Sequence, residues 1–199
     1  MFGYGTADLL CLTFVAEYFI EAGYAVVFLH RKFSLLPYSR HYSHTTNCFL
    51  DFMVEGSKGR VEGNRQFPRL ECLMCCLVGP QYASSMLPVL RKYKEAKENN
   101  MLLLLDFVTV HDYLFQLRLL AHCLQPCGGA VLYYLAAAVS DFHIPPSRMS
   151  EHKIQSLGSG NSLTIVMDPV PKFLSHLVQK WAPSATIISF KVFHFSGSI

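Results

Sequence analysis

Several signatures of common enzyme classes are missing from this chain of 199 residues. It contains no Walker phosphate loop, no HExxH and no GxSxG sequence, which excludes the commonest NTPase and hydrolase assignments. The formal net charge is only +3 and the basic residues are dispersed, so the composition does not favour nucleic-acid binding. Seven cysteines, an odd number without framework spacing, predict a reduced, cytosolic protein.

A long uninterrupted hydrophobic run is also lacking. The most apolar stretch, residues 9–29, contains Glu17, Glu21 and Gly23, which argues against a transmembrane helix. The N-terminus has no basic segment ahead of an apolar one, so a secretory signal is not indicated either. We therefore expect a cytosolic protein without a membrane partner.

Metal-binding motifs are weak. The chain has a CxxC pair, Cys72 and Cys75, and Cys123 and Cys127 could complete a four-sulfur zinc site. No second CxxC lies at zinc-ribbon spacing, so buried free thiols are the better interpretation. The His-Tyr-Ser-His sequence at 41–44 has no carboxylate or thiol close by and is typical of a surface loop. We predict no metal site among the protein's own side chains.

The residues that are present favour a single buried core. Hydrophobic residues make up 51% of the chain, charged residues 16%, and the mean hydropathy is +0.26. The length suits one α/β domain, which we expect to cover residues 1–199. The patterns predict helices over 6–21, 82–99, 111–124 and 171–181, and strands over 24–29, 101–108, 131–135, 163–167 and 186–190, with a possible short strand near 48–54. This alternation predicts right-handed crossovers and a mostly parallel sheet.

Two helix boundaries have specific signals. Gly23 is placed to cap the first helix at its C-terminus, and Thr109 is placed to cap the helix that begins near residue 111. His111, Asp112 and Cys123 have the residue types of a Cys–His nucleophile. The helix dipole alone explains Asp112, so a core or capping role is the better interpretation of this group.

The most informative segment follows the predicted strand 131–135. Three consecutive alanines, 136–138, remove side-chain bulk where the strand ends, and a ligand can approach the backbone closely there. Asp141 and Lys153 add an acid and a cation beyond this gap, and a fixed cation suits the phosphates of a nucleotide or an acyl phosphate. The competing interpretation is an alanine-rich core strand with two surface charges, and the residues alone leave both open.

Two later segments add candidate ligand contacts. Pro171 begins a predicted helix, and Lys172 lies in its first turn, where the helix dipole disfavours a cation unless an anion is bound. Phe190 and Lys191 lie at the carboxyl end of the last predicted strand, where Phe190 can stack on a base and Lys191 can meet phosphate. A core phenylalanine and a solvated lysine are the alternative.

These segments combine into a family pattern. The sequence reads LAAAVSDF at 135–142, EHKIQS at 151–156, VPKFL at 170–174, IISFK at 187–191, and AEYF followed by EAGYAVVFLHR within 16–31. In this order and spacing the chain resembles eukaryotic phosphopantothenate–cysteine ligases. The resemblance runs from about Ala16 to Lys191 and is loosest between Phe33 and Glu98.

The resemblance implies a Rossmann-like three-layer sandwich that works as a homodimer in coenzyme A biosynthesis. In that family a nucleoside triphosphate, ATP in animal members, activates the carboxylate of phosphopantothenate, and the amine of cysteine then forms the amide. Mg²⁺ is expected with the triphosphate. Lys153 is the implied catalytic residue, facing the phosphate and the acyl intermediate. The nucleotide contacts implied by the resemblance are Leu135, Ala136, Ala137, Asp141, Lys153, Val170, Pro171, Lys172, Phe173 and Phe190.

Two parts of the family pattern are not found. A glycine loop and an Asn-containing segment should precede Ala16, and residues 1–15 contain neither. An acidic element and a lysine-bearing helix should follow Lys191. We therefore expect a truncated form in which the first strand, the glycine loop and the C-terminal elements are missing. The alternative function is that of a catalytically impaired isoform that binds nucleotide weakly or serves as a dimerisation partner.

Overall fold

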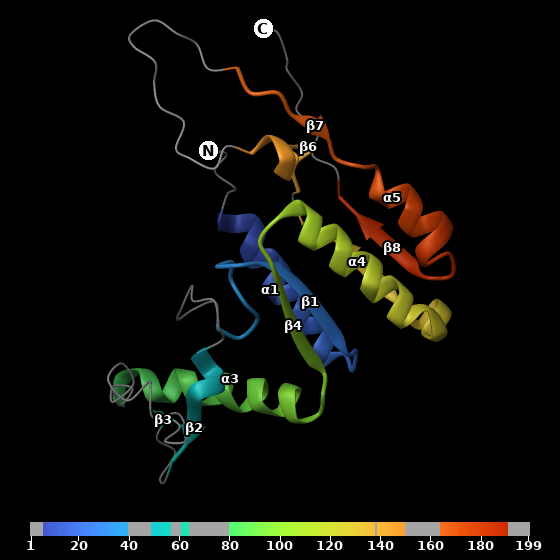
Figure 1. The fold of residues 1–199 in the computed structure, drawn as a ribbon. Coiled ribbons are helices and arrows are strands. Elements are labelled where there is room, and N and C mark those ends of the chain that lie inside the picture. The colour runs from blue at the N-terminus through green and yellow to red at the C-terminus, as the bar shows by residue number, and fades with distance from the viewer. Residues whose placement is uncertain are drawn as a thin grey trace, which may run out of the picture. The chain divides into compact units, whose positions relative to one another are not determined.

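The computed structural model describes residues 6–39, 49–56, 61–63, 80–137, 139–149 and 164–190 (Figure 1). The chain divides into two compact units, unit 1 from Met1 to Phe107 and unit 2 from Val108 to Ile199. Within its described residues, each unit combines helices with one parallel and one antiparallel pair of strands. The predicted α/β composition with parallel pairing is confirmed, whereas the single domain over 1–199 stays a prediction.

Unit 1 is built around one parallel strand pair. Its elements are α1 (Thr6–Glu21), β1 (Val26–Arg31), the 3₁₀ turn η1 (Phe49–Phe52), β2 (Met53–Glu55), β3 (Val61–Gly63), α3 (Pro80–Glu98) and β4 (Leu102–Phe107). β1 pairs with β4 in parallel, from Val26 opposite Leu102 to Arg31 opposite Phe107. β2 and β3 form a short antiparallel pair.

Gly23 ends α1, as the sequence predicts. Its φ is +90°, a conformation that glycine adopts without a Cβ clash. The amide of Gly23 donates to the Ile20 carbonyl and the amide of Tyr24 to the Phe19 carbonyl, both at 2.9 Å. This pair of bonds satisfies carbonyls that the last helical turn leaves open, and it directs the chain from α1 into β1.

The core of unit 1 gathers on one face of α3. Met86, Leu90 and Tyr93 are buried at helical spacing, and Tyr93 donates its hydroxyl to the Asp51 carboxylate of η1. The remaining members of this cluster come from the loop after β1, from η1, from the strands and, in the case of Ala96, from α3 itself. They are Leu36, Tyr38, Leu50, Met53, Val61, Ala96 and Leu102. The polar tip of Tyr93 is thus paired although its side chain is fully buried.

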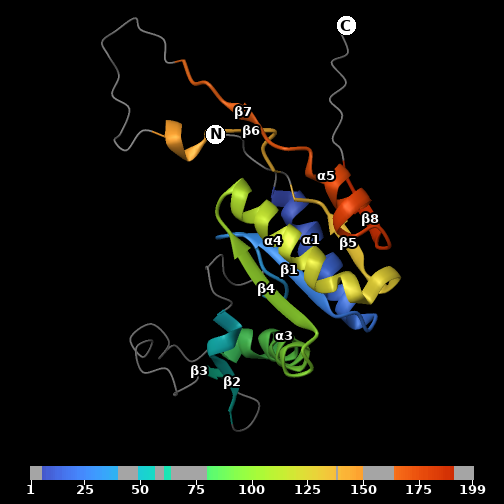
Figure 2. The same ribbon diagram turned by 45° about the vertical axis from the view of Figure 1, so that its right-hand side comes forward.

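Unit 2 holds the segments that carry the ligand candidates. Its elements are α4 (Val110–Leu124), the 3₁₀ segment η4 (Gln125–Ala130), β5 (Leu132–Leu135), β6 (Phe142–His143), η5 (Pro146–Arg148), β7 (Asp168–Pro169), α5 (Phe173–His176), the π-helical turn η6 (Leu177–Trp181) and β8 (Thr186–Ser189). β5 pairs with β8 in parallel, and β6 pairs with β7 antiparallel. Figure 1 and Figure 2 show the carboxyl end of β8 on the same side of unit 2 as β6, β7 and the start of α5.

The core of unit 2 joins α4 to the turn η6. Its buried residues are Tyr113, Leu117, Ala121, Tyr133, Leu177 and Ala182. Trp181 adds a partly exposed contact at the same junction, because the guanidinium of Arg118 lies 5.9 Å from its ring centroid and the His176 ring stacks 6.0 Å away. An arginine over an indole face is a favourable cation–π arrangement.

A capping box starts α4. The Thr109 hydroxyl accepts a hydrogen bond from the Asp112 amide at 3.1 Å, and the Asp112 carboxylate accepts one from the Thr109 amide at 2.9 Å. Two backbone amides that the helix leaves open are satisfied in this way. The predicted capping roles of Thr109 and Asp112 are therefore confirmed.

Replacing Thr109 with Ala is expected to destabilise the protein by about 1 kcal/mol, because the Asp112 amide loses its acceptor. Thr109→Ser keeps that acceptor and should cost much less. Urea denaturation followed by circular dichroism compares the two variants. Equal midpoints for Thr109→Ala and the unmodified chain would contradict the capping role.

Two predicted elements of unit 2 are wrong in position. Residues 164–167, the described part of the strand predicted over 163–167, form no strand, and Ile165, Val166 and Met167 are exposed. No described strand lies alongside to bury them, and pairing falls on Asp168 and Pro169 instead.

None of the described helices has the length and apolar character that crossing a membrane requires.

The last predicted helix begins two residues late. Lys172 has φ −70° and ψ 76°, and the Phe173 amide donates to the Pro171 carbonyl at 2.7 Å. These values describe an inverse γ-turn centred on Lys172, which delays the helix until Phe173. Lys172 therefore holds the N-cap position of a four-residue helix and not a place in its first turn, so the predicted conflict with a helix dipole is wrong.

Candidate functional site

The carboxyl ends of β5 and β8 lie side by side. The parallel register places Leu135 opposite Ser189, so Ala136 and Phe190 each follow the end of a paired strand. We call Leu135, Ala136, Ala137 and Phe190 the strand-end site. The Phe190 ring is 58% exposed, and its centroid lies 5.1 Å from that of Tyr134. A supported aromatic face beside small residues is an arrangement on which a planar ligand can stack.

A backbone hydrogen bond ties the loop after β5 to the segment before α5. The Val170 amide donates to the Asp141 carbonyl at 2.8 Å, next to the short β6–β7 pair. The Ser140 hydroxyl donates to the Phe142 carbonyl at 2.7 Å and shapes the turn that holds Asp141. The Asp141 side chain is exposed and free to meet solvent or a ligand. Two predicted contacts that are 29 residues apart in sequence are thus brought together.

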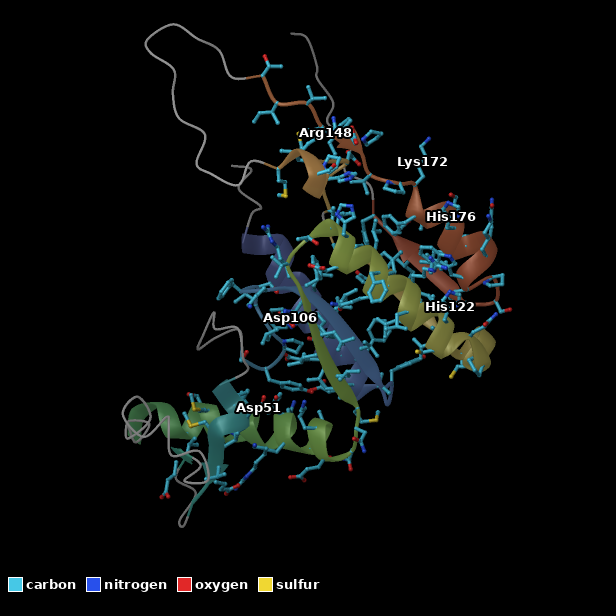
Figure 3. All side chains as sticks on the ribbon, viewed as in Figure 1. Asp51, Asp106, His122, Arg148, Lys172 and His176 are labelled. Carbon is cyan, nitrogen blue, oxygen red and sulfur yellow. The ribbon has the colours of Figure 1, made fainter. Side chains whose placement is uncertain are left out.

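The residues after Val170 divide between core and surface. Phe173 packs edge-on against Tyr113 of α4, with ring centroids 5.9 Å apart. Burial raises the pKa of the Tyr113 hydroxyl to about 12, so Tyr113 acts as a packing residue and not as an acid or base near neutral pH. Lys172 is exposed, and Figure 3 shows it extending away from the ribbon of unit 2. Phe173 therefore has a structural role that the sequence did not indicate.

Some candidate residues lie outside the described part of the chain, and two cysteines are exposed where burial was expected. Lys153 and Lys191 belong to the segments that the structure does not describe, as do Cys72 and Cys75. Cys123 and Cys127 are free and exposed, so the expectation of buried thiols is wrong for these two. Cys123 lies in the last turn of α4, off the face that Tyr113, Leu117 and Ala121 bury, and Cys127 lies in η4, which has no buried residue.

The sequence did not indicate a polar cluster beside β6. Arg148 forms an ion pair with Asp168 of β7, and Asp168 stands opposite His143 in the β6–β7 register. The His143 ring in turn meets His111 of α4. Strands of two residues carry no period that a sequence pattern can reveal, so no signal could have found this cluster.

Acid is expected to destabilise unit 2 through Asp168 and Asp112. The Arg148 guanidinium holds the pKa of Asp168 below its ordinary value, and the Thr109 amide does the same for Asp112. Because both pKa values are lower in the folded state, their stabilising effect is present above the unfolded pKa of about 3.9 and is lost as pH falls through the folded value. The urea midpoint should drop between roughly pH 5 and pH 3. Arg148→Ala should flatten part of that drop, and an unchanged pH profile in this variant would contradict the assignment.

A small cavity lies at the other end of the same strands. Its volume is about 70 Å³, and its lining includes Val131, Tyr133 and Ala185. Val131 and Ala185 precede the amino ends of β5 and β8, and the Thr186 amide donates to the Val131 carbonyl at 3.0 Å. Ligand pockets usually measure about 300–1,000 Å³. The cavity is therefore too small for a nucleotide and is separate from the strand-end site.

Known proteins are similar to this chain in sequence. The Saccharomyces cerevisiae phosphopantothenate–cysteine ligase Cab2 is 41% identical over 198 residues, covering 89% of this chain and 48% of Cab2. The Homo sapiens phosphopantothenate–cysteine ligase is 42% identical over 177 residues, covering 89% of this chain and 52% of the human protein. This chain is a homologue of the phosphopantothenate–cysteine ligases.

The fold agrees with that of a phosphopantothenate–cysteine ligase. A solved structure of a Cab2 variant in complex with phosphopantothenate-cysteine matches with a TM-score of 0.70 and 39% identity, over 92% of this chain and 55% of that chain. The Rossmann-like α/β class predicted from the sequence is confirmed by this match. The chain spans about half the length of the curated phosphopantothenate–cysteine ligases that it matches. No protein-family model matches the sequence.

Proposed function

We propose that this chain provides the nucleotide-binding part of a ligase that joins phosphopantothenate to cysteine at the expense of ATP. The observation that carries the proposal is the parallel register of β5 and β8, which sets two small residues, Ala136 and Ala137, beside the exposed ring of Phe190. Homologues that share about two fifths of the sequence are phosphopantothenate–cysteine ligases. The base stacks on Phe190, and the ribose and phosphates run along the alanines toward Asp141.

The proposed ligation reaction requires a positively charged group beside the phosphates of the nucleotide. Activation of the phosphopantothenate carboxylate spreads negative charge over a phosphate, and a fixed ammonium group there stabilises the transition state. Lys153 supplies that group in the proposal, in keeping with its place in the EHKIQS sequence. Mg²⁺ accompanies the triphosphate, bound mainly through phosphate oxygens, and supports the same charge.

Val170 and Pro171 complete the nucleotide pocket, with Lys172 at its rim, and Phe173 supports it from behind by packing against Tyr113. The hydrogen bond from Val170 to Asp141 supports this grouping, since it joins the two segments. We further propose that the protein acts as a homodimer in the cytosol. Size-exclusion chromatography with light scattering measures the dimer directly.

Replacing Ala137 with Leu is expected to weaken ATP binding by roughly 10- to 100-fold, because the larger side chain overpacks the space along the backbone. Ala137 is exposed, so the thermal midpoint should not change. Ala130→Leu is the matched control, since Ala130 is also exposed but precedes the amino end of β5. Isothermal titration with ATP and Mg²⁺ compares the variants, and equal affinities for both would reject the nucleotide path.

The whole reaction is tested by incubating the chain with phosphopantothenate, cysteine, ATP and Mg²⁺. Formation of phosphopantothenoylcysteine above a control without ATP supports the ligase function. ATP binding without product instead supports the second candidate function, a partner that binds nucleotide or dimerises but does not ligate. A chain that forms no product, does not bind ATP and is monomeric would reject both functions.

A further inference from the structure

The β5–β8 pair places Tyr134 and Phe190 on one face of the sheet. Tyr134 stands opposite Ile188 in the parallel register, and Phe190 follows two residues after Ile188. Side chains two residues apart along an extended chain share a face, so Phe190 is the diagonal neighbour of Tyr134. Tyr133, the residue before Tyr134, points to the other face and is buried there. Tyr134 is therefore not part of the core that Tyr133 joins.

The rings of Tyr134 and Phe190 are in direct contact. Their centroids are 5.1 Å apart, and their planes are inclined by 53°. Aromatic pairs attract each other at centroid separations of about 4.5–7 Å. Tyr134 is half-buried, whereas Phe190 is 58% exposed. Tyr134 thus holds part of the Phe190 ring and leaves the rest of it open to a ligand.

The residue beside Phe190 on the neighbouring strand is too small to hold its ring. Leu135 pairs with Ser189, so the next residues along the two strands are Ala136 and Phe190. Phe190 also lies beyond the last residue of β8. A phenylalanine side chain in such a place can turn among its staggered rotamers unless a larger neighbour restrains it. Tyr134 is a neighbour of that size on the same face.

We propose that Tyr134 is a positioning residue that holds the Phe190 ring in the orientation on which a nucleotide base stacks. This inference rests on the proposed function, in which Phe190 is the stacking residue. A ring that is already held loses less conformational freedom when the base binds, so the affinity for the nucleotide is higher. The contact uses the ring of Tyr134, and Tyr134→Phe keeps it.

Isothermal titration of the full chain with ATP and Mg²⁺ tests this role. Tyr134→Leu keeps an apolar side chain but removes the ring, and we expect the dissociation constant of ATP to rise about 3- to 10-fold. Tyr134→Phe should recover the affinity of the unmodified chain to within about twofold. Equal affinities for Tyr134→Leu and the unmodified chain would overturn the inference. So would a loss in Tyr134→Phe as large as that in Tyr134→Leu.

A double-substitution cycle separates positioning from a general loss of structure. Phe190→Leu removes the stacking ring itself, so it should weaken ATP binding by about 10-fold or more. Adding Tyr134→Leu to Phe190→Leu should cause no further loss, because the effect of Tyr134 passes through the Phe190 ring. If Tyr134→Leu weakens binding equally in both backgrounds, it acts on the structure of the strand pair in general, and the inference is wrong.

The same titrations distinguish a failure of this inference from a failure of the proposed function. If the unmodified chain binds no ATP, the nucleotide-binding function and the role of Tyr134 are rejected together. If the unmodified chain binds ATP and Tyr134→Leu binds it equally well, only the role of Tyr134 is rejected.

Discussion

Replacing Lys153 with Ala is expected to lower the rate of phosphopantothenoylcysteine formation by a factor of about 10² to 10³. The removed ammonium group is the cation proposed to face the charge that develops on the transferring phosphate, and loss of one such stabilising group typically costs about 3–4 kcal/mol of transition-state stabilisation. ATP affinity should fall by less, because the effect is concentrated in the transition state. Single-turnover ligation assays with ATP and Mg²⁺ measure the rate.

Two matched variants separate this role from a general effect of charge. Lys153→Arg keeps the charge but changes its shape and reach, so it should restore only part of the rate. Lys180→Ala removes an exposed lysine of η6 and should leave the rate unchanged. If Lys153→Ala and Lys180→Ala behave alike, Lys153 has no catalytic role.

The largest loss of stability is expected for Leu177→Ala, at about 2–5 kcal/mol. Leu177 is completely buried at the start of η6, between α5 and the core of α4, so removal of its side chain leaves a cavity. Leu174→Ala is the control, because Leu174 lies in α5 but is 37% exposed. Its cost should stay near 0.5 kcal/mol. Urea denaturation followed by circular dichroism compares them, and equal midpoints would show that Leu177 does not anchor this turn.

Much of the helical structure could be predicted from the sequence. The apolar period and charged face of 82–99 predict α3, and Gly23 and Thr109 mark helix ends by backbone and side-chain chemistry that acts locally. The apolar run at 101–108 likewise predicts β4 within two residues. These signals succeed because each one acts within a few turns of chain.

Two features of unit 2 could not be predicted, one because it depends on strand pairing and one because the local signal is ambiguous. An apolar run at 164–167 has the composition of a strand, yet strands require a neighbour, and the pairing in this region falls on two-residue strands instead. The γ-turn at Lys172 could not be predicted either, because Pro171 suits the first position of a helix as well as a turn. Pairing with another strand decides the first case, and a choice between two local conformations decides the second.

Part of the candidate site could likewise be predicted from the sequence, and part of it is seen only in the structure. A run of small residues at a strand end predicts an open ligand edge, and the register of β5 with β8 places Phe190 beside it. Only the structure shows that Val170 bonds to the Asp141 carbonyl and that Phe173 is used for packing. The histidine pair had no sequence signal, because His111 and His143 are 32 residues apart and belong to different elements.

Trp181 gives the molecule an internal optical probe. It is the single tryptophan of the chain, and it belongs to unit 2. Its intrinsic fluorescence therefore follows that unit alone, and the neighbouring Arg118 and His176 make the emission sensitive to any loosening between α4 and η6. Comparing the emission transition with the total ellipticity of the chain would reveal whether the two units melt together or one after the other.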